Sequence, residues 1–279
     1  MLRLRVITAV LLLLVLLPAM VYPGPWPFAL VTGALMAAAG WEWCRLNGAG
    51  PRAARVGGAA LAVGLVVLWW RWGHAPWPAA VWWGITALWA VVLVLALRQG
   101  VEAWGRWPRM VRLVFGALVL GAAWWALVSL HARGLGALLS AFLLVWVADI
   151  AAYFGGKALG RHKLAPRISP GKSWEGALSG ALAVLVLAQL WTAVERAWLP
   201  GADGLYPRLW AQGVPLALSA LLLLTAASVA GDLFESLVKR SAGVKDSSGL
   251  LPGHGGVLDR IDALLPVLPA VMALHTWLA

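Results

Sequence analysis

Long apolar runs, separated by short polar segments, dominate this chain and limit the folds that it can adopt. We count nine such runs, at residues 6–22, 26–44, 56–72, 78–97, 111–130, 135–154, 175–194, 213–231 and 257–278. Most are close to the roughly 20 apolar residues that an α-helix needs to cross a membrane. Inside a bilayer each backbone N–H and C=O group must be paired within the protein, so runs of this length fold as helices. The sequence therefore predicts an all-α polytopic membrane protein with about nine transmembrane helices.

Composition agrees with this fold class. Of the 279 residues, 62% are hydrophobic and only 12% are charged, whereas soluble domains have roughly 25% charged residues. We find no internal repeat and no soluble domain, and we predict a single integral membrane domain over residues 1-279, with N-terminal helices in 1-134 and, in 135-279, the helices and loops that carry the polar segments described below. The first apolar run has no convincing cleavage site, so we expect a retained helix rather than a signal peptide.

The net charge of +11 does not indicate nucleic-acid binding, because the basic residues lie in short loops between apolar runs. If the N-terminus is inside, 18 of the 22 Lys and Arg residues lie in inside segments and 4 in outside segments. Basic residues favour the cytoplasmic side and anionic lipid. We therefore expect a bacterial-type inner (plasma) membrane protein with a cytoplasmic N-terminus, a cytoplasm-facing polar site and an outside C-terminus.

One polar stretch, Gly231–Asp262, contains five acids and four bases in an otherwise apolar chain. In a helix, Asp232, Glu235, Ser236 and Lys239 fall on one face, because they are spaced i, i+3, i+4 and i+7. The apolar run that precedes them places this face at a membrane surface. The pattern predicts a carboxylate-bearing helix end at the cytoplasmic side.

A glycine-rich loop follows this helix. Residues 245–256 contain Pro252 and three glycines around His254, and Asp259 and Asp262 come one turn apart on the next helix. Two carboxylate-bearing helix ends would then face each other across a cationic turn. Carboxylate oxygens suit a divalent ion, while Lys, Arg and free backbone N–H groups suit phosphate. The stretch predicts a metal and polyphosphate site.

The same stretch carries a family resemblance. Ser236-Leu-Val-Lys239-Arg240, four residues, Lys245-Asp246, and then Leu251-Pro252-Gly253-His254-Gly255-Gly256-Val257-Leu258-Asp259-Arg260-Ile261-Asp262 resembles the signature of the phosphatidate cytidylyltransferases, or CDP-diacylglycerol synthases. More than a dozen specified positions agree over the 27 residues 236–262. A lone His-Gly-Gly or Asp-x-x-Asp would be a weak signal, whereas this string is specific.

A second polar segment, residues 149–176, also resembles the family. It begins at Asp149, and we predict that the glycines of 155–160 interrupt the helix there. Ser173 is a plausible N-cap of the next helix, whose free N–H groups beside Lys172 would form a seat for phosphate. The resemblance thus covers two cytoplasmic loops and their helices, while the first 130 residues resemble the family only in hydropathy and number of spans.

The resemblance implies that CTP and phosphatidic acid react to CDP-diacylglycerol and pyrophosphate. The expected catalytic residues are Asp232, Lys239, Asp246, Asp259 and Asp262. The expected phosphate-binding residues are Ser169, Lys172, Ser173, Ser236, Arg240, Lys245, His254, Gly255, Gly256 and Arg260. The expected ligands of Mg²⁺ are Asp232, Asp246, Asp259 and Asp262, and a second ion is compatible with them. The attacking lipid phosphate is already ionised at neutral pH, so the reaction needs positioning and charge stabilisation rather than a strong base.

Two other functions fit parts of the pattern. A related CTP-dependent enzyme could act on a polyprenol or isoprenoid lipid, as a nucleotidyl- or phosphotransferase, and the full 236–262 string argues against it. An ion-coupled transporter could use Asp149, Asp232 and Asp259 as intramembrane carboxylates, but the charges gather at one membrane face and no repeat is evident. Glu42 can be interfacial or functional, and we do not include it in the site. A homodimer is compatible with so much apolar surface.

Overall fold

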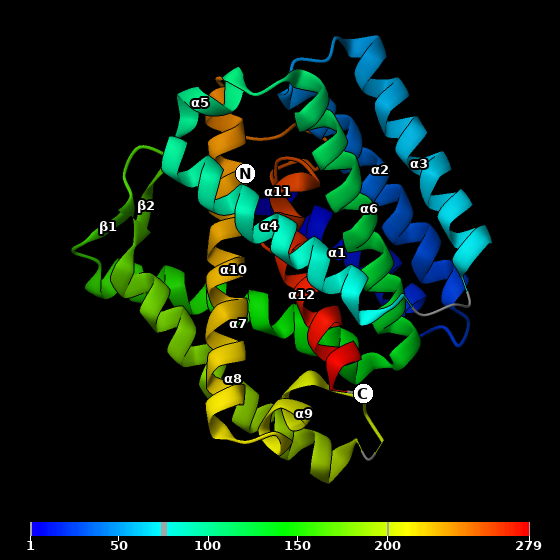
Figure 1. The fold of residues 1–279 in the computed structure, drawn as a ribbon, viewed down its shortest axis with the longest axis vertical. Helices are drawn as coiled ribbons and strands as arrows, with labels where there is room; N and C mark the ends of the chain where they lie inside the picture. Colours follow the sequence, from blue (N-terminus) through cyan, green and yellow to red (C-terminus); the bar gives the residue numbers. More distant parts are fainter. Residues whose placement is uncertain (1, 74–76, 200, 279) are drawn as a thin grey trace.

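The computed structural model describes residues 2–73, 77–199 and 201–278, which form one bundle of helices (Figure 1). The long helices are α1 (Leu2–Val21), α2 (Pro25–Leu46), α3 (Pro51–Trp72), α4 (Ala79–Gln99), α6 (Arg109–Arg133), α7 (Leu135–Leu159), α8 (Trp174–Trp198), α10 (Val214–Ser241) and α12 (Leu264–Trp277). The short helices are α5 (Val101–Arg106), α9 (Leu205–Ala211) and α11 (Leu258–Ile261). The prediction of a mainly helical membrane protein is confirmed.

Seven helices in the described part of the chain are long and apolar enough to cross a membrane: α1, α3, α4, α6, α7, α8 and α10. The predicted count of nine is therefore not confirmed. Helix α2 carries the buried acid Glu42. Helix α12 has 14 residues, or about 21 Å at 1.5 Å per residue, which is less than the roughly 30 Å of a bilayer core. The predicted span 257–278 is interrupted because its first residues form α11 and part of the polar site.

A small antiparallel sheet lies between α7 and α8, and it is the exception to an all-α fold. Strand β1 (Lys163–Ala165) pairs with β2 (Ser169–Ser173), so that Lys163 lies opposite Ser173. In Figure 1 this hairpin projects from one side of the bundle, next to α10. The predicted all-α class holds for the membrane helices but not for this segment.

The predicted interruption of the helix at residues 155–160 is wrong, because α7 continues to Leu159. The glycines permit close packing against α8 instead. A Cβ atom on Gly155 would lie 2.1 Å from Ser179 Oγ, and one on Gly176 would lie 2.7 Å from the Ala152 carbonyl oxygen. Small residues allow helix backbones to approach closely in membranes. Helices α7 and α8 are thereby held together below the hairpin.

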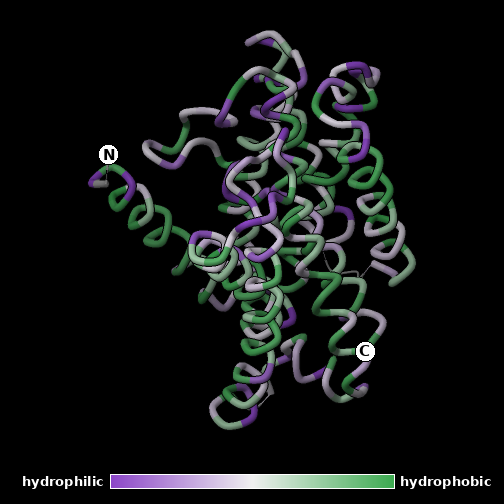
Figure 2. Tube along the Cα trace, turned by 90° about the vertical axis from the view of Figure 1, so that its left-hand side faces the viewer, coloured by the Kyte–Doolittle hydropathy of each residue, from purple (hydrophilic) through white to green (hydrophobic). Residues whose placement is uncertain are grey.

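Helix α12 occupies the centre of the bundle, among α4, α6, α7 and α10 (Figure 1). Its side chains are buried on all sides, including Val267, Leu268 and Val271 at 0% exposure. A helix that is apolar all round is typical of the interior of a bundle. By contrast, α1 projects away from the bundle at the N-terminus (Figure 2) and is largely exposed. Because α12 is buried, the segment before it, which includes α11, also enters the interior of the bundle.

Candidate active site

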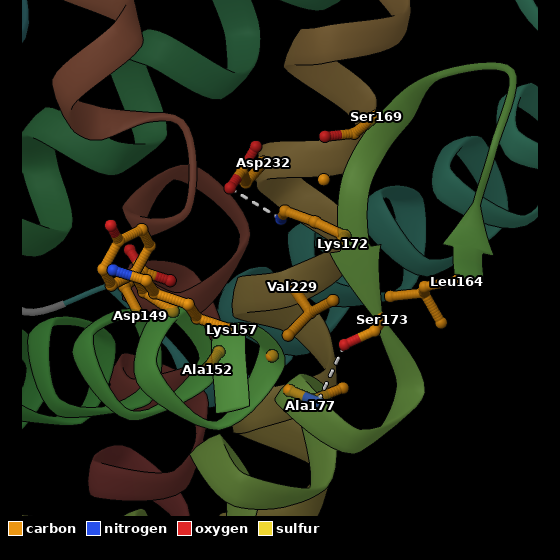
Figure 3. A pocket seen from close by; sticks show the side chains of 14 residues that line it. Asp149, Ala152, Lys157, Leu164, Ser169, Lys172, Ser173, Ala177, Val229 and Asp232 are labelled. Atoms are coloured by element: carbon orange, nitrogen blue, oxygen red, sulfur yellow. Dashed lines mark hydrogen bonds and ion pairs between the residues drawn. The ribbon is translucent and has the colours of Figure 1, made fainter. Parts of the chain in front are cut away.

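An ion pair joins the two polar segments of the sequence. Lys172 Nζ, from β2, lies 2.6 Å from Asp232 Oδ2, from α10. Both side chains border a cavity of about 450 Å³, and Figure 3 shows them joined directly to each other. The other lining residues come from α7, the hairpin, α8 and α10: Asp149, Ala152, Tyr153, Gly156, Lys157, Leu164, Ser169, Gly171, Ser173, Gly176, Ala177 and Val229.

The hairpin is fixed at the start of α8, which orients Lys172. Ser173 Oγ accepts a hydrogen bond from the Gly176 N–H at 3.2 Å, so the predicted N-cap is confirmed. The Glu175 carboxylate accepts hydrogen bonds from the backbone N–H groups of Arg161 and His162, at 3.1 and 3.2 Å. These contacts hold both ends of the hairpin, and the side chain of Lys172 is directed into the cavity as a result.

A second charged cluster lies where α10 meets α11. Lys239 Nζ lies 2.6 Å from Asp259 Oδ1 and also pairs with the buried Glu235 carboxyl one turn back on α10. Asp259 Oδ2 accepts hydrogen bonds from Ser247 N at 2.9 Å, Ser247 Oγ at 2.8 Å and Gly256 N at 2.7 Å. Burial raises the pKa of Asp259, but the hydrogen bonds from Lys239, Gly256 and Ser247 outweigh it and lower that pKa to about 2. Asp259 is thus an anion that closes the loop before it.

Asp262 is brought to Asp232 by a close approach of backbones. A Cβ atom on Gly231 would lie 2.8 Å from the Asp262 carbonyl oxygen and 2.8 Å from Pro266 Cγ, so only glycine fits there. Burial, and then the negative charge of Asp232, raises the pKa of Asp262 to about 8. The two carboxyl groups are therefore unfavourable neighbours that a cation between them would stabilise.

The remaining predicted residues lie around these two clusters. Ser236 Oγ donates a hydrogen bond to Asp232 Oδ1 at 3.4 Å. Asp246 borders Gly255, where an added Cβ would lie 3.6 Å from Asp246 Cβ and 2.7 Å from Asp259 Oδ2. His254 N donates to the Leu251 carbonyl at 2.8 Å.

The outlying basic residues form no such contacts. Arg240, Lys245 and Arg260 have exposed side chains and form no ion pair within the parts of the chain that are described. The pKa of His254 is lowered by burial and by the nearby Arg260 and Arg5. The structure thus brings together most of the predicted acids with two lysines, and it leaves three exposed cations outside them that form no ion pair among the described residues.

Sequence comparison decides the family. The model of the cytidylyltransferase family matches residues 3–278. The chain belongs to the cytidylyltransferase family. This confirms the predicted family and makes the protein a nucleotidyltransferase, and it gives no support to the transporter alternative.

Two of the relatives match over almost their whole length, and a third matches over less than half of its length. The phosphatidate cytidylyltransferase of Pseudomonas aeruginosa is 43% identical over 285 residues, which cover 98% of this chain and 97% of the relative. That of Haemophilus influenzae is 34% identical over 298 residues, covering 96% of each. That of Brucella suis is 52% identical over 124 residues, covering 44% of this chain and 41% of the relative. With seven helices among its described residues that are long and apolar enough to cross a membrane, this cytidylyltransferase is a multi-pass membrane protein similar to bacterial enzymes.

Sequence reasoning left three acids out of the site of this cytidylyltransferase. Asp149 lines the cavity, and Glu235 pairs with Lys239. Glu42, on α2, is fully buried and accepts hydrogen bonds from the backbone N–H groups of Val257 and Leu258. An acid inside an apolar helix is a signal for a functional role. That signal was present for Glu42, but nothing in the sequence shows which residues it contacts.

Proposed function

We propose that this protein transfers the cytidylyl group of CTP to phosphatidic acid, forming CDP-diacylglycerol and releasing pyrophosphate. The observation that carries the proposal is the Lys172–Asp232 pair, which borders a cavity of about 450 Å³ between the two segments of family resemblance. The full-length relatives from Pseudomonas and Haemophilus, both named phosphatidate cytidylyltransferase, support the same substrate. A cavity of this size suits a small polar ligand such as a nucleotide.

Charge stabilisation and positioning are the tasks of the site. A phosphate oxygen of phosphatidic acid attacks the α-phosphorus of CTP, and the bond to the β-phosphate oxygen breaks. Lys172 and Lys239 stabilise negative charge on the phosphates, while Ser169, Ser173 and the Gly255 N–H supply hydrogen bonds. The exposed cations Arg240, Lys245 and Arg260 attract the polyanions, and His254 and Ser236 help to orient them. Preformed dipoles and charges of this kind lower the barrier of group transfer.

A divalent metal fits the acids that the fold gathers. Asp262 lies beside Asp232 with its pKa raised, and the buried Glu235 Oε1 accepts no hydrogen bond from the described residues. No group of three His, Cys, Asp or Glu side chains within the described ranges is already arranged as a metal centre. Asp232, Asp246, Asp259 and Asp262 would hold Mg²⁺ together with substrate, and a second ion is compatible with them. A bound Mg²⁺ would supply positive charge for the phosphates and for the pyrophosphate that leaves.

The protein lies in the bacterial inner membrane, with its N-terminus and both polar segments on the cytoplasmic side and its C-terminus outside. The distribution of Lys and Arg supports this orientation. A tag that is read at the N-terminus in the cytoplasm and at the C-terminus outside would test it. The single integral domain over 1-279 and the homodimer stay predictions, which size determination in detergent would test.

The decisive experiment is turnover by the purified full chain in detergent with phosphatidic acid, CTP and Mg²⁺, beside Asp259→Asn. We expect CDP-lipid and pyrophosphate in equal amounts, dependent on CTP and metal, and lost in the variant. Asp203→Asn is the matched control. Asp203 lies between α8 and α9 and is also ion-paired, but with Arg208 of α9 rather than with a residue of the site. Turnover of CTP with a polyprenol but not with phosphatidic acid would replace this proposal with the polyprenol enzyme.

A further inference from the structure

Glu42 makes a contact that the reaction described above does not use. Glu42 is 0% exposed and lies in the last two turns of α2, between Trp41 and Trp43. Oε1 accepts a hydrogen bond from Val257 N at 3.0 Å, and Oε2 accepts one from Leu258 N at 2.7 Å. Ser248 Oγ donates a third, at 2.5 Å, to Oε1. Every one of these donors belongs to the glycine-rich segment that ends at α11.

The carboxyl groups of Glu42 and Asp259 connect the two ends of this segment. Asp259 binds Ser247 on one side and Gly256 on the other. Glu42 binds the next residue at each end, Ser248 and Val257. The loop between them is held in a fixed shape by acids from two distant parts of the chain. Because Asp259 also pairs with Lys239, the position of the loop is coupled to α10.

The fit around Glu42 is tight. A Cβ atom on Gly256 would lie 2.3 Å from Glu42 Oε1 and 2.0 Å from Ser247 Oγ, so the loop passes Glu42 with no room for a side chain. The first N–H groups of a helix have no partner within the helix, and the Glu42 carboxyl satisfies those of Val257 and Leu258. A buried polar contact that is fully satisfied specifies one local arrangement.

Helix α1 supports the tip of the same loop. Arg5 Nε donates a hydrogen bond to the Gly253 carbonyl at 2.9 Å, and Thr8 Oγ1 donates one to the Pro252 carbonyl at 2.9 Å. The N-terminal helices therefore hold the loop both at its base and at its tip. These contacts give α1 and α2 a role beyond anchoring in the membrane.

We infer that Glu42 is a positioning residue for the transfer reaction, which holds the Ser247–Leu258 loop so that Asp259 and Gly255 keep their places in the site. Glu42 does not border the cavity and does not touch the reacting atoms; it acts through the loop. This inference rests on the proposed function for its effect on turnover, while its effect on the loop is independent of the reaction.

The test compares Glu42→Gln with wild type in detergent. Glutamine keeps the shape but has a single acceptor oxygen, so its NH₂ group faces a backbone N–H and at least one hydrogen bond is lost. We expect the amide hydrogens of the loop to exchange at least about tenfold faster. The Mg²⁺ concentration for half-maximal turnover should rise about 10–100-fold, as is typical when partners of metal ligands are lost. The KM for phosphatidic acid should not change, and Glu42→Asp, which keeps both acceptors, should recover part of the loss.

Glu195→Gln is the matched control, because Glu195 is also a buried acid but contacts Trp191 on α8. It should leave loop exchange and metal dependence at wild-type values. If Glu42→Gln does not fold, Ser248→Ala decides, since it removes one bond to Glu42 and should speed exchange in the loop. Wild-type exchange and metal dependence in Glu42→Gln, or equal changes in Glu195→Gln, would overturn the inference. A wild-type protein that makes no CDP-lipid would refute the proposed function alone, and loop exchange would still decide the role of Glu42.

Discussion

Lys172 Nζ and Asp232 Oδ2 lie 2.6 Å apart, although the two residues belong to different segments separated by the whole of α8. Their side chains are about one quarter exposed, at 25% and 30%. The pair is therefore accessible from the cavity rather than sealed in the core. An ion pair at the wall of a cavity can be broken by a charged ligand, so we interpret it as a resting contact that substrate phosphate and metal replace.

Substitutions at this pair should reduce turnover without unfolding the protein. Lys172→Met and Asp232→Asn should each lower kcat/KM about 10²–10³-fold, the usual effect of removing one group that stabilises transition-state charge. The double variant should lose much less than the product of the two, because residues that act together are not additive. Steady-state kinetics of the four proteins tests this. Fully multiplicative losses would show that the two side chains act separately.

Asp259→Asn should affect stability as well as activity. Asp259 and Lys239 have side chains that are only 5% and 13% exposed, and breaking a buried pair by removing one partner costs about 3–5 kcal/mol. The amide also replaces an oxygen that accepts from Ser247 and Gly256. We expect a lower thermal midpoint in detergent together with lost turnover. Asp203→Asn, also in an ion pair, should keep full turnover; equal losses in both variants would point to a general effect of ion-pair removal.

Gly231→Ala tests whether the approach of α10 to Asp262 is required. The added methyl would overlap the Asp262 carbonyl oxygen and Pro266, each 2.8 Å away. Overpacking of this kind costs about 1–3 kcal/mol, and it would also move Asp232 relative to Asp262. We expect a lower thermal midpoint and reduced turnover. Gly121→Ala, in the middle of α6 where nothing lies within 4 Å of the new methyl, should retain both.

Features that depend on adjacent residues can be predicted from the sequence, whereas contacts between distant residues cannot. Ser173 was identified as an N-cap because capping depends on a few adjacent residues. The glycines at 155 and 156 were misread, because the same residue that can break a helix can also allow a neighbouring helix to pack closely. The partners of Glu42 could not be found, since Leu258 is 216 positions away in the chain and no local pattern reports such a contact.

The interrupted final span has a similar cause. Hydropathy treats residues 257–278 as one apolar run, but Leu258 and Val257 are buried because the loop and α11 enter the bundle, not because they form a membrane-spanning helix. Irregular backbone is tolerated at that depth where protein surrounds it. The predicted site residues were chosen from a long motif string, which carries no information on the shape of the backbone around them.

Removal of Mg²⁺ and the substitution Asp262→Asn should have different effects on turnover and on thermal stability. Chelation should abolish turnover, and Mg²⁺ should raise the thermal midpoint, since a ligand that binds only the folded state stabilises it by about 2.7 kcal/mol at 100 times its Kd. Asp262→Asn keeps an oxygen for the Ala263 N–H, which now donates at 2.8 Å to Asp262 Oδ1, but it removes the repulsion from Asp232. We expect this variant to be inactive, at least as stable as wild type without metal, and insensitive to Mg²⁺. Thermal unfolding with and without Mg²⁺ measures all three, and an unchanged Mg²⁺ shift in the variant would exclude Asp262 as a ligand.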